Sequence, residues 1–108
     1  MTVGNAIPFP NPRQLKRVFI LMMINNGTVY GYDILRKIEK ELLIKMTSSE
    51  LYLTLRKMET EKIISSIWQT THKKPKRVYS LTPHGKEILE KTKSGLRENF
   101  ENITKKLQ

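Results

Sequence analysis

The chain has 108 residues, enough for one domain with a single modest core. Its 20 lysines and arginines against 10 acidic residues give a net charge of +10, which favours a polyanionic partner: nucleic acid first, an anionic membrane surface second. The chain contains no cysteine, which excludes disulfides and thiolate metal sites, and its two histidines have no ligand spacing. The first ten residues show no signal-peptide pattern, and the longest apolar run is far shorter than the ~20 residues that span a bilayer. We therefore expect a soluble, cytoplasmic protein without metal or cofactor.

The N-terminal part is expected to be an extended arm over residues 1–10, followed by a helix. Asn11 is a suitable N-cap, Pro12 suits the first helical position, and Gly27 suits the turn after the last residue, near position 26. The middle of this helix, residues 18–24, is apolar on every side. Such a helix must be covered all round, which a domain of this size hardly achieves alone. We infer that a second subunit covers one face; the alternative is the central helix of a compact monomer.

Two further helices are expected over residues 31–43 and 48–61, with a short link between them. The second has a buried stripe made of Ile34, Leu35, Ile38 and Leu42. The third begins with Ser48 or Ser49 as its N-cap, and its narrow stripe consists of Leu51, Leu55 and Met58. Three helices with a short turn before the third form a helix-turn-helix, whose third helix enters the DNA major groove. The spacing alone is a weak signal, and an ordinary amphipathic surface helix is the alternative.

The opposite face of the third helix carries the candidate DNA-reading side chains. Arginine and lysine pair with guanine, serine and threonine are permissive, and leucine can contact a thymine methyl group. This face is polar at its start and basic in its middle. Its residues are Ser49, Leu53, Arg56, Lys57 and Thr60.

After residue 62 the hydrophobic period changes from 3.6 towards 2, which predicts strands over residues 63–70 and 76–81. Tyr79 and Leu81 are expected to point to the core. The hairpin tip between the strands, residues 71–75, opens a basic stretch made of Lys73, Lys74, Lys76 and Arg77. A basic hairpin directly after a helix-turn-helix is typical of a wing that contacts phosphates or a minor groove. The alternative is a solvated loop that happens to be basic.

The last helix is expected to begin with Thr82 as N-cap and Pro83 as first residue, and to continue to the chain end. Its apolar positions recur at spacings of three and four, as in a coiled coil, although Gly95 weakens the helix locally. This seam consists of Leu89, Thr92, Leu96, Phe100, Ile103 and Leu107. Within the chain only the apolar first helix remains as its partner, so we predict a homodimer in which both helices pack about a two-fold axis. The predicted interface is Val18, Phe19, Met22, Leu89, Leu96, Phe100, Ile103 and Leu107.

Several short segments occur in a characteristic order. They are Tyr-Gly-Tyr at 30–32, Glu-Leu-Tyr-x-x-Leu-x-Lys-Met-Glu at 50–59, Ile-Ile-Ser-Ser-x-Trp at 63–68, Lys-Pro-Lys-Arg-Val-Tyr-Ser-Leu-Thr at 74–82, and Gly85. In this order they resemble the PadR family of transcriptional regulators, over about residues 15–89. The resemblance implies a homodimeric winged-helix repressor on an inverted-repeat operator, with Tyr52 reaching the DNA backbone. The single C-terminal helix is similar to that of the small subfamily, which dimerises through it.

Two departures from the family pattern concern turns. Lys62 stands where the family usually has glycine, and a left-handed non-glycine residue costs about 1–2 kcal/mol, which allows this turn to be built differently. The wing tip lacks the glycines that are usual in the family, so Pro75 is the residue expected to determine its conformation. Some members bind aromatic compounds through a tryptophan of the last helix. Here Trp68 lies in a strand, so a drug-sensing role does not carry over, and whether any effector exists is unknown.

These patterns predict a mainly α fold with a two-stranded β-hairpin wing: an arm over 1–10, a winged helix-turn-helix over 11–82 and a dimerisation helix over 83–108. The leading function is binding of double-stranded DNA as a transcriptional regulator. Alternatives are an architectural or chromatin-type DNA-binding protein, which discriminates little between sequences, and a winged-helix protein-interaction module. No catalytic pattern is present, so enzyme activity is not expected. The expected DNA contacts are Ser48, Ser49, Tyr52, Leu53, Arg56, Lys57, Lys73, Lys74, Lys76 and Arg77.

Overall fold

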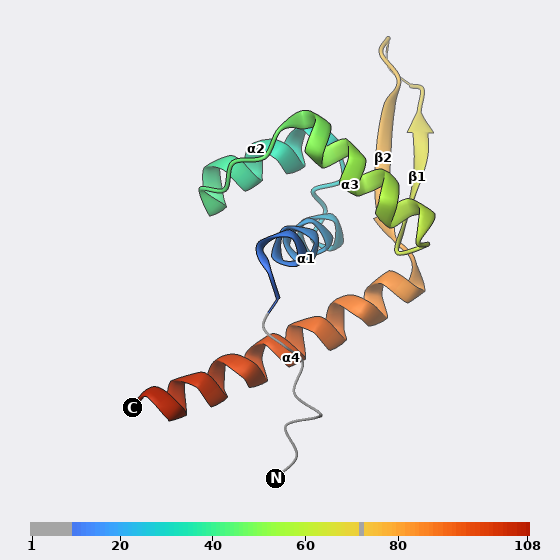
Figure 1. The fold of residues 1–108 in the computed structure, drawn as a ribbon. Helices are drawn as coiled ribbons and strands as arrows, with labels where there is room; N and C mark the ends of the chain where they lie inside the picture. The colour runs from blue at the N-terminus through green and yellow to red at the C-terminus, as the bar shows by residue number, and fades with distance from the viewer. Residues whose placement is uncertain (1–9, 72) are drawn as a thin grey trace.

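The computed structural model describes residues 10–71 and 73–108. Its elements are α1 (Pro12–Asn25), α2 (Gly31–Leu42), α3 (Ser48–Thr60), β1 (Ile64–Gln69), β2 (Lys76–Leu81) and α4 (Pro83–Leu107). Figure 1 shows α1 between the α2–α3 pair and α4, with the hairpin rising beside α3. This order confirms the predicted winged helix-turn-helix with a long C-terminal helix. The arm expected over residues 1–10 lies, apart from Pro10, outside the described residues.

Local capping fixes where the helices begin. The side chain of Asn11 accepts the Gln14 N–H at 2.9 Å, and the side chain of Gln14 accepts the Asn11 N–H at 2.9 Å, which completes a capping box at α1. The N-cap of α3 is Thr47, so the prediction that Ser48 or Ser49 caps this helix is wrong. The Thr47 hydroxyl accepts the Glu50 N–H in the first turn and so fills the role of the cap. Ser48 and Ser49 are instead the first two residues of the helix, and both are exposed.

The turn after α3 is a left-handed C-cap built on a lysine. Lys62 has a φ of 61°, its N–H donates to the Glu59 carbonyl at 3.0 Å, and the Ile63 N–H donates to the Met58 carbonyl at 3.0 Å. These two hydrogen bonds define a Schellman motif, and buried Ile63 and Met58 provide its apolar contact. The expectation that Lys62 lets this turn be built differently is therefore wrong. The backbone takes the conformation typical of glycine with a lysine in place.

One hydrophobic core lies among α1, α2, α3, α4 and the foot of the hairpin. The predicted stripe of α3 is confirmed, since Leu51, Leu55 and Met58 are fully buried. On α1 the chain itself buries Val18, Ile20, Leu21, Met23 and Ile24. Phe19 and Met22 are half-buried against the same core. Because α2, β2 and α4 all contact α1, most of its surface is covered without a second subunit, which favours the central-helix alternative for α1.

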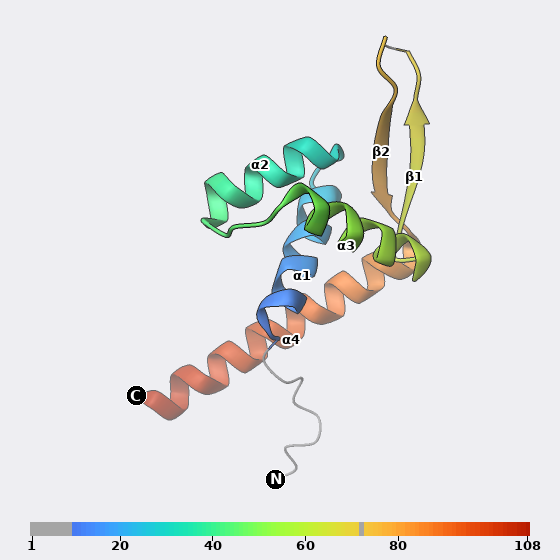
Figure 2. The same ribbon diagram turned by 45° about the horizontal axis from the view of Figure 1, so that its top comes forward.

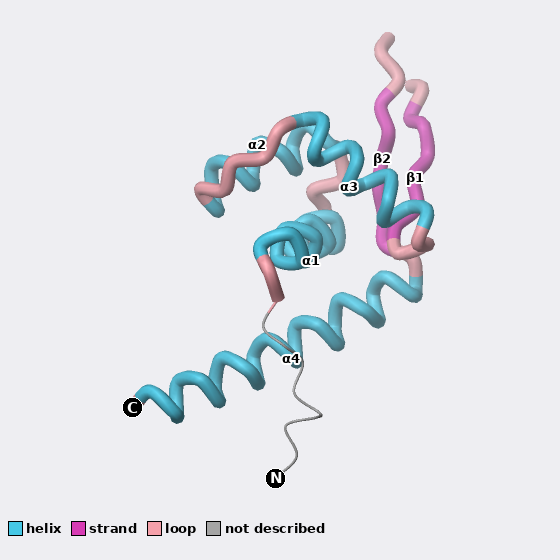
Figure 3. Tube along the Cα trace, in the orientation of Figure 1, coloured by secondary structure: helices cyan, strands magenta, loops and turns pink. Residues whose placement is uncertain are grey.

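The hairpin is joined to the helical core on two sides. β1 and β2 pair antiparallel with Ile64 opposite Leu81, and the Tyr79 N–H donates to the Val29 carbonyl at 3.0 Å. Tyr79 is buried and Leu81 packs half-buried against the core, as predicted. Figure 3 shows the hairpin tip standing clear of the helices. The foot of the hairpin is therefore fixed while its tip is open to a partner.

Gly85 allows α4 to approach the turn after α3 very closely. The Thr82 hydroxyl caps α4 by accepting the Gly85 N–H at 3.0 Å, and it also donates to the Lys62 carbonyl at 2.6 Å. A Cβ at position 85 would lie 1.9 Å from the carbonyl oxygen of Ile63. Only glycine fits there, which explains why a Thr-Pro-x-Gly sequence begins this helix.

The apolar seam of α4 is divided between the two halves of the helix. Leu89 is fully buried and Leu96 is half-buried against the core. Beyond them α4 extends away from the domain, as Figure 2 shows, and Phe100, Ile103 and Leu107 are 64%, 42% and 82% exposed. No helix of the described residues combines the length and apolarity needed to cross a membrane.

Candidate nucleic-acid interface

The candidate reading residues form one continuous exposed surface on α3. Five of them surround a shallow depression: Ser48, Ser49, Tyr52, Leu53 and Arg56. Lys57 is also exposed, and within residues 10–71 and 73–108 neither it nor Arg56 has a side-chain hydrogen bond or ion pair. The Thr60 hydroxyl donates to the Arg56 carbonyl at 3.0 Å, so it can only accept a further hydrogen bond. The face is thus available to a partner at most of its positions.

The carboxylates of α3 and its C-cap are engaged by the rest of the domain. Glu50 pairs with Lys16 of α1 at 2.8 Å. Glu61 pairs with Arg17 of α1. Glu59 accepts a hydrogen bond from β1. Such half-exposed pairs contribute about 0–1 kcal/mol each to stability, so their main effect is on local charge. They leave the reading face of α3 basic.

The four wing cations divide into two kinds. Lys73 and Lys74 are exposed at the hairpin tip and have no side-chain partner among the described residues. Lys76 lies over the Tyr30 ring, with Nζ 5.3 Å from the ring centroid. Arg77 lies over the Trp68 ring at 5.1 Å. The side chains of Lys73 and Lys74 are therefore free to move, whereas those of Lys76 and Arg77 are held against aromatic rings. Tyr30 was not among the predicted site residues.

A chain of hydrogen bonds connects the wing to α3. Arg77 Nε donates to Ser66 Oγ at 2.9 Å, and Ser66 Oγ donates to a Glu59 carboxylate oxygen at 2.7 Å. Sequence reasoning placed Arg77 at the DNA but missed Ser66 and Glu59 as its supports. The alternation of β1 puts Ser66 and Trp68 on one face, and this was the signal that could have indicated a shared role.

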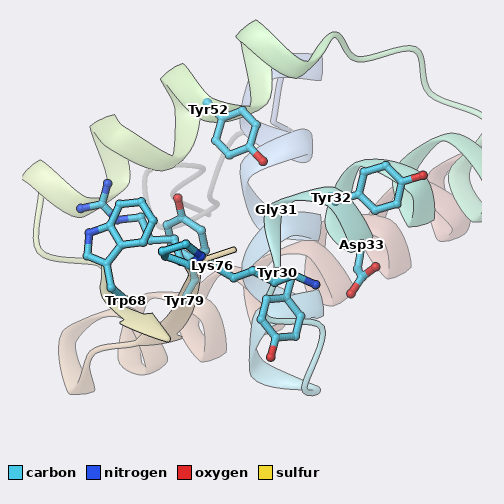
Figure 4. Close-up of a pocket in the computed structure, with 10 residues that line it drawn as sticks. Tyr30, Gly31, Tyr32, Asp33, Tyr52, Trp68, Lys76 and Tyr79 are labelled. Atoms are coloured by element: carbon cyan, nitrogen blue, oxygen red, sulfur yellow. The ribbon is translucent and has the colours of Figure 1, made fainter. Parts of the chain in front are cut away.

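An aromatic pocket of about 430 Å³ lies between α3, the start of α2 and the hairpin, as Figure 4 shows. Its aromatic members are Tyr30, Tyr32, Tyr52, Trp68 and Tyr79. Lys76 and Arg77 line it as well, together with a single carboxylate, Asp33. Tyr52 belongs both to this pocket and to the depression on α3, so the two surfaces are continuous.

Tyr79 combines a buried ring with an unused hydroxyl. The residue is only 4% exposed, and none of the hydrogen bonds of the described residues involves its hydroxyl. That oxygen is not fully enclosed, because no fully buried side-chain oxygen in this part of the chain lacks a partner. Figure 4 shows that hydroxyl directed towards α3, between Trp68 and Tyr52. Burial raises the pKa of Tyr79 above its ordinary value of 10.0, against the opposing charge of Arg77. The phenol therefore keeps its proton at neutral pH and remains a hydrogen-bond donor.

The match to a protein family decides what kind of protein this is. The model of the Transcriptional regulator PadR-like family matches residues 20–91. The chain belongs to the PadR-like family. The resemblance found in the sequence is thereby confirmed, and this family consists of regulators rather than enzymes. Across the described part of this PadR-like chain, no cluster of histidine and acidic side chains could hold a metal ion.

Solved structures of other family members share the fold. A PadR-like regulator from Bacillus cereus is 25% identical, with a TM-score of 0.79 over 89% of this chain and 94% of that one. A PadR family regulator from Clostridium difficile is 24% identical, with a TM-score of 0.77 over 86% and 98%. Bacillus subtilis PadR, solved in complex with operator DNA, is 29% identical, with a TM-score of 0.64 over 71% of this chain and 46% of that one.

The search of curated proteins found no match to this PadR-like chain. The individual DNA contacts and the interface residues therefore stay predictions.

Proposed function

We propose that this PadR-like regulator binds operator DNA with α3 in the major groove and the hairpin against the adjacent backbone. The observation that carries the proposal is the exposed basic face of α3, whose own carboxylates are engaged elsewhere in the domain. Further support comes from the Bacillus subtilis relative, which was solved with operator DNA.

The side chains divide into readers of bases and contacts to the backbone. Arg56 and Lys57 pair with guanine, and Leu53 contacts a thymine methyl group. Ser48 and Ser49 accept or donate hydrogen bonds at the start of the helix. The tip lysines, Lys73 and Lys74, neutralise phosphates, which positions the protein without specifying sequence.

The regulator acts as a homodimer on an inverted repeat. Support comes from the uncovered seam of Phe100, Ile103 and Leu107, which continues into an apolar groove of about 390 Å³ between α1 and α4. The groove includes Val18 and Leu96, which sequence reasoning placed at the interface. A second α4 would cover both surfaces, and a two-fold axis would set the recognition helices about 34 Å apart on one side of the duplex. Repression is the proposed outcome, because an occupied operator excludes other proteins from the same DNA.

Selection from random DNA tests this function directly. The expected product is an inverted repeat whose half-sites are one helical turn apart. Arg56→Ala should then weaken binding to the selected site by about 1–3 kcal/mol and relax the preference at one base pair per half-site. Arg13→Ala, which removes an exposed arginine of α1 outside the proposed interface, is the matched control.

The alternatives make different predictions in the same titrations. An architectural DNA-binding protein would yield no enriched sequence, and Arg56→Ala would then weaken binding equally to selected and scrambled DNA. A protein-interaction module would show no change in DNA affinity for any α3 variant. Either result would contradict sequence-specific regulation.

A further inference from the structure

We propose that the aromatic pocket between α3 and the hairpin seats one backbone phosphate of the bound DNA. The hydroxyls of Tyr52 and Tyr79, the guanidinium of Arg77 and the first N–H groups of α2 hold this phosphate. The inference rests on the proposed DNA binding and adds to it a fixed point on the sugar–phosphate strand.

The position of the pocket matches the path of a DNA strand. In a duplex, one sugar–phosphate strand separates each major groove from the neighbouring minor groove. The pocket has α3 on one side and the hairpin on the other (Figure 4). A duplex that receives α3 in its major groove and meets the hairpin on its flank must lay that strand across the pocket. Tyr52 lines both the reading face and the pocket, so no ridge separates the two surfaces.

The start of α2 offers unpaired donors to this strand. Side chains cap α1, α3 and α4, but Tyr30 at the N-cap of α2 makes no capping hydrogen bond. A Cβ added to Gly31, the first residue of α2, would lie 2.7 Å from the Tyr52 hydroxyl oxygen. That hydroxyl therefore lies directly against the open helix start. Free N–H groups and the helix dipole both favour an anion at this point.

Tyr79 provides the second, independent observation. Its ring is held in the core of the domain, yet its hydroxyl faces the pocket, takes part in none of the hydrogen bonds of the described residues and is not fully enclosed. Because burial raises the pKa of Tyr79, the hydroxyl stays protonated and can donate to a phosphate oxygen. The side chain is buried while its hydroxyl oxygen stays accessible from the pocket, so this donor is available to a ligand that enters there.

Charge and orientation in the pocket suit a single anion. Lys76 and Arg77 outweigh Asp33, the one carboxylate among the lining residues. Ser66 and Trp68 hold the Arg77 side chain through Nε and the guanidinium face. Its terminal nitrogens keep their donors, so a phosphate would bind an arginine that is already oriented.

The test removes single hydroxyls from the full chain and single charges from the DNA. Tyr79→Phe and Tyr52→Phe are titrated against the selected operator, and against operators that carry one neutral methylphosphonate at successive positions flanking each half-site. Ser80→Ala is the matched control, because it removes a hydroxyl from the other face of the hairpin, where it lies 3.1 Å from that of Ser65. Thermal unfolding of each variant checks that the domain is intact.

We expect Tyr79→Phe to bind unmodified DNA about 10-fold more weakly, as is typical for loss of a hydrogen bond to a charged group. Selected and scrambled DNA should be affected alike, and the salt slope should stay unchanged because no cation is removed. At one methylphosphonate position, wild type and Tyr79→Phe should bind equally, and Tyr52→Phe should lose its defect at the same position. Ser80→Ala should match wild type throughout.

Two results would overturn the phosphate seat. One is wild-type affinity of both Tyr79→Phe and Tyr52→Phe; the other is a defect that persists at every methylphosphonate position. Arg56→Ala would still report base reading in either case, so the proposed function would stand. The proposed function fails separately, if the wild-type chain enriches no sequence from random DNA.

Discussion

At the scale of single residues, Gly85 leaves no room for a side chain. Gly85→Ala would place a Cβ against the backbone oxygen of Ile63, which cannot move without shifting the turn after α3. We expect a loss of about 3 kcal/mol or more, at the upper end for overpacked sites. Urea unfolding measures it. Gly31→Ala is the control, because its added Cβ meets only the tip of the Tyr52 side chain, which can rotate away; equal losses would show that the clash with the backbone is not the cause.

Lys62 holds a conformation that suits glycine better. The left-handed conformation of Lys62 costs about 1–2 kcal/mol of stability, which glycine would avoid. Glycine would in turn lose roughly 0.5–1 kcal/mol of stability, because its unfolded chain has more conformational entropy to lose. Lys62→Gly should therefore stabilise the domain by up to about 1.5 kcal/mol, visible as a higher urea midpoint. Lys62→Ala keeps the strain and should bring no gain. A midpoint for Lys62→Gly at or below that of Lys62→Ala would mean that the turn is not strained.

At the scale of elements, the hydrogen bonds from Arg77 through Ser66 to Glu59 set the wing against α3. Ser66→Ala should lower stability by about 0.5–1.5 kcal/mol and weaken binding to every DNA sequence, because Arg77 loses its orientation. Ser65→Ala is the matched control. Its hydroxyl lies on the other face of β1, 3.1 Å from that of Ser80. Equal DNA affinities of the two variants would show that Ser66 does not position Arg77.

The hairpin tip should act through charge alone. Replacing Lys73 and Lys74 together by alanine removes two exposed cations without touching the core. Affinity should fall for all sequences, and the slope of log K against log salt should flatten by about 0.9 for each phosphate that is no longer neutralised. An unchanged slope, with weaker binding at one preferred site only, would argue against a backbone role for the tip.

The sequence predicts the elements well because each has a local cause: Pro12 and Pro83 begin helices, Gly27 follows one, and the period changes after residue 62. The cap of α3 was misassigned because Thr47 and the next two serines are all good caps. The choice among them is tertiary: Met46, just before, is buried and sets where the chain turns. Likewise, no local pattern shows that α4 crosses back over α1 and buries it, or that the Tyr79 hydroxyl opens into a pocket. The exposure of the polar face of α3 was predictable, since helical period alone places it opposite the buried stripe.

At the scale of the whole molecule, α4 makes the protein elongated, with extents of 58 × 29 × 21 Å. Its first half completes the core, and its second half carries large apolar side chains into solvent. An exposed apolar seam of this kind is typical of an interaction surface. The two halves of α4 therefore differ: Leu89 and Leu96 pack against the core, whereas Phe100, Ile103 and Leu107 are exposed and would be covered in the proposed dimer.

This division makes Phe100 the sharpest test of the dimer. Phe100→Glu places a charge in the uncovered part of the seam, whereas a change at half-buried Leu96 would disturb the core as well. We expect Phe100→Glu to be a folded monomer by light scattering, with unchanged affinity for a single half-site and much weaker binding to the full inverted repeat. Asn102→Glu adds the same charge at an exposed position off the seam and should remain a dimer. A wild-type chain that is monomeric at micromolar concentration, or a Phe100→Glu variant that stays dimeric, would rule out assembly through α4. With a monomeric wild type, the half-sites would have to be bound by independent monomers, and the strength of the operator would no longer depend on their spacing. A dimeric Phe100→Glu variant would instead place the dimer interface on another surface of the domain.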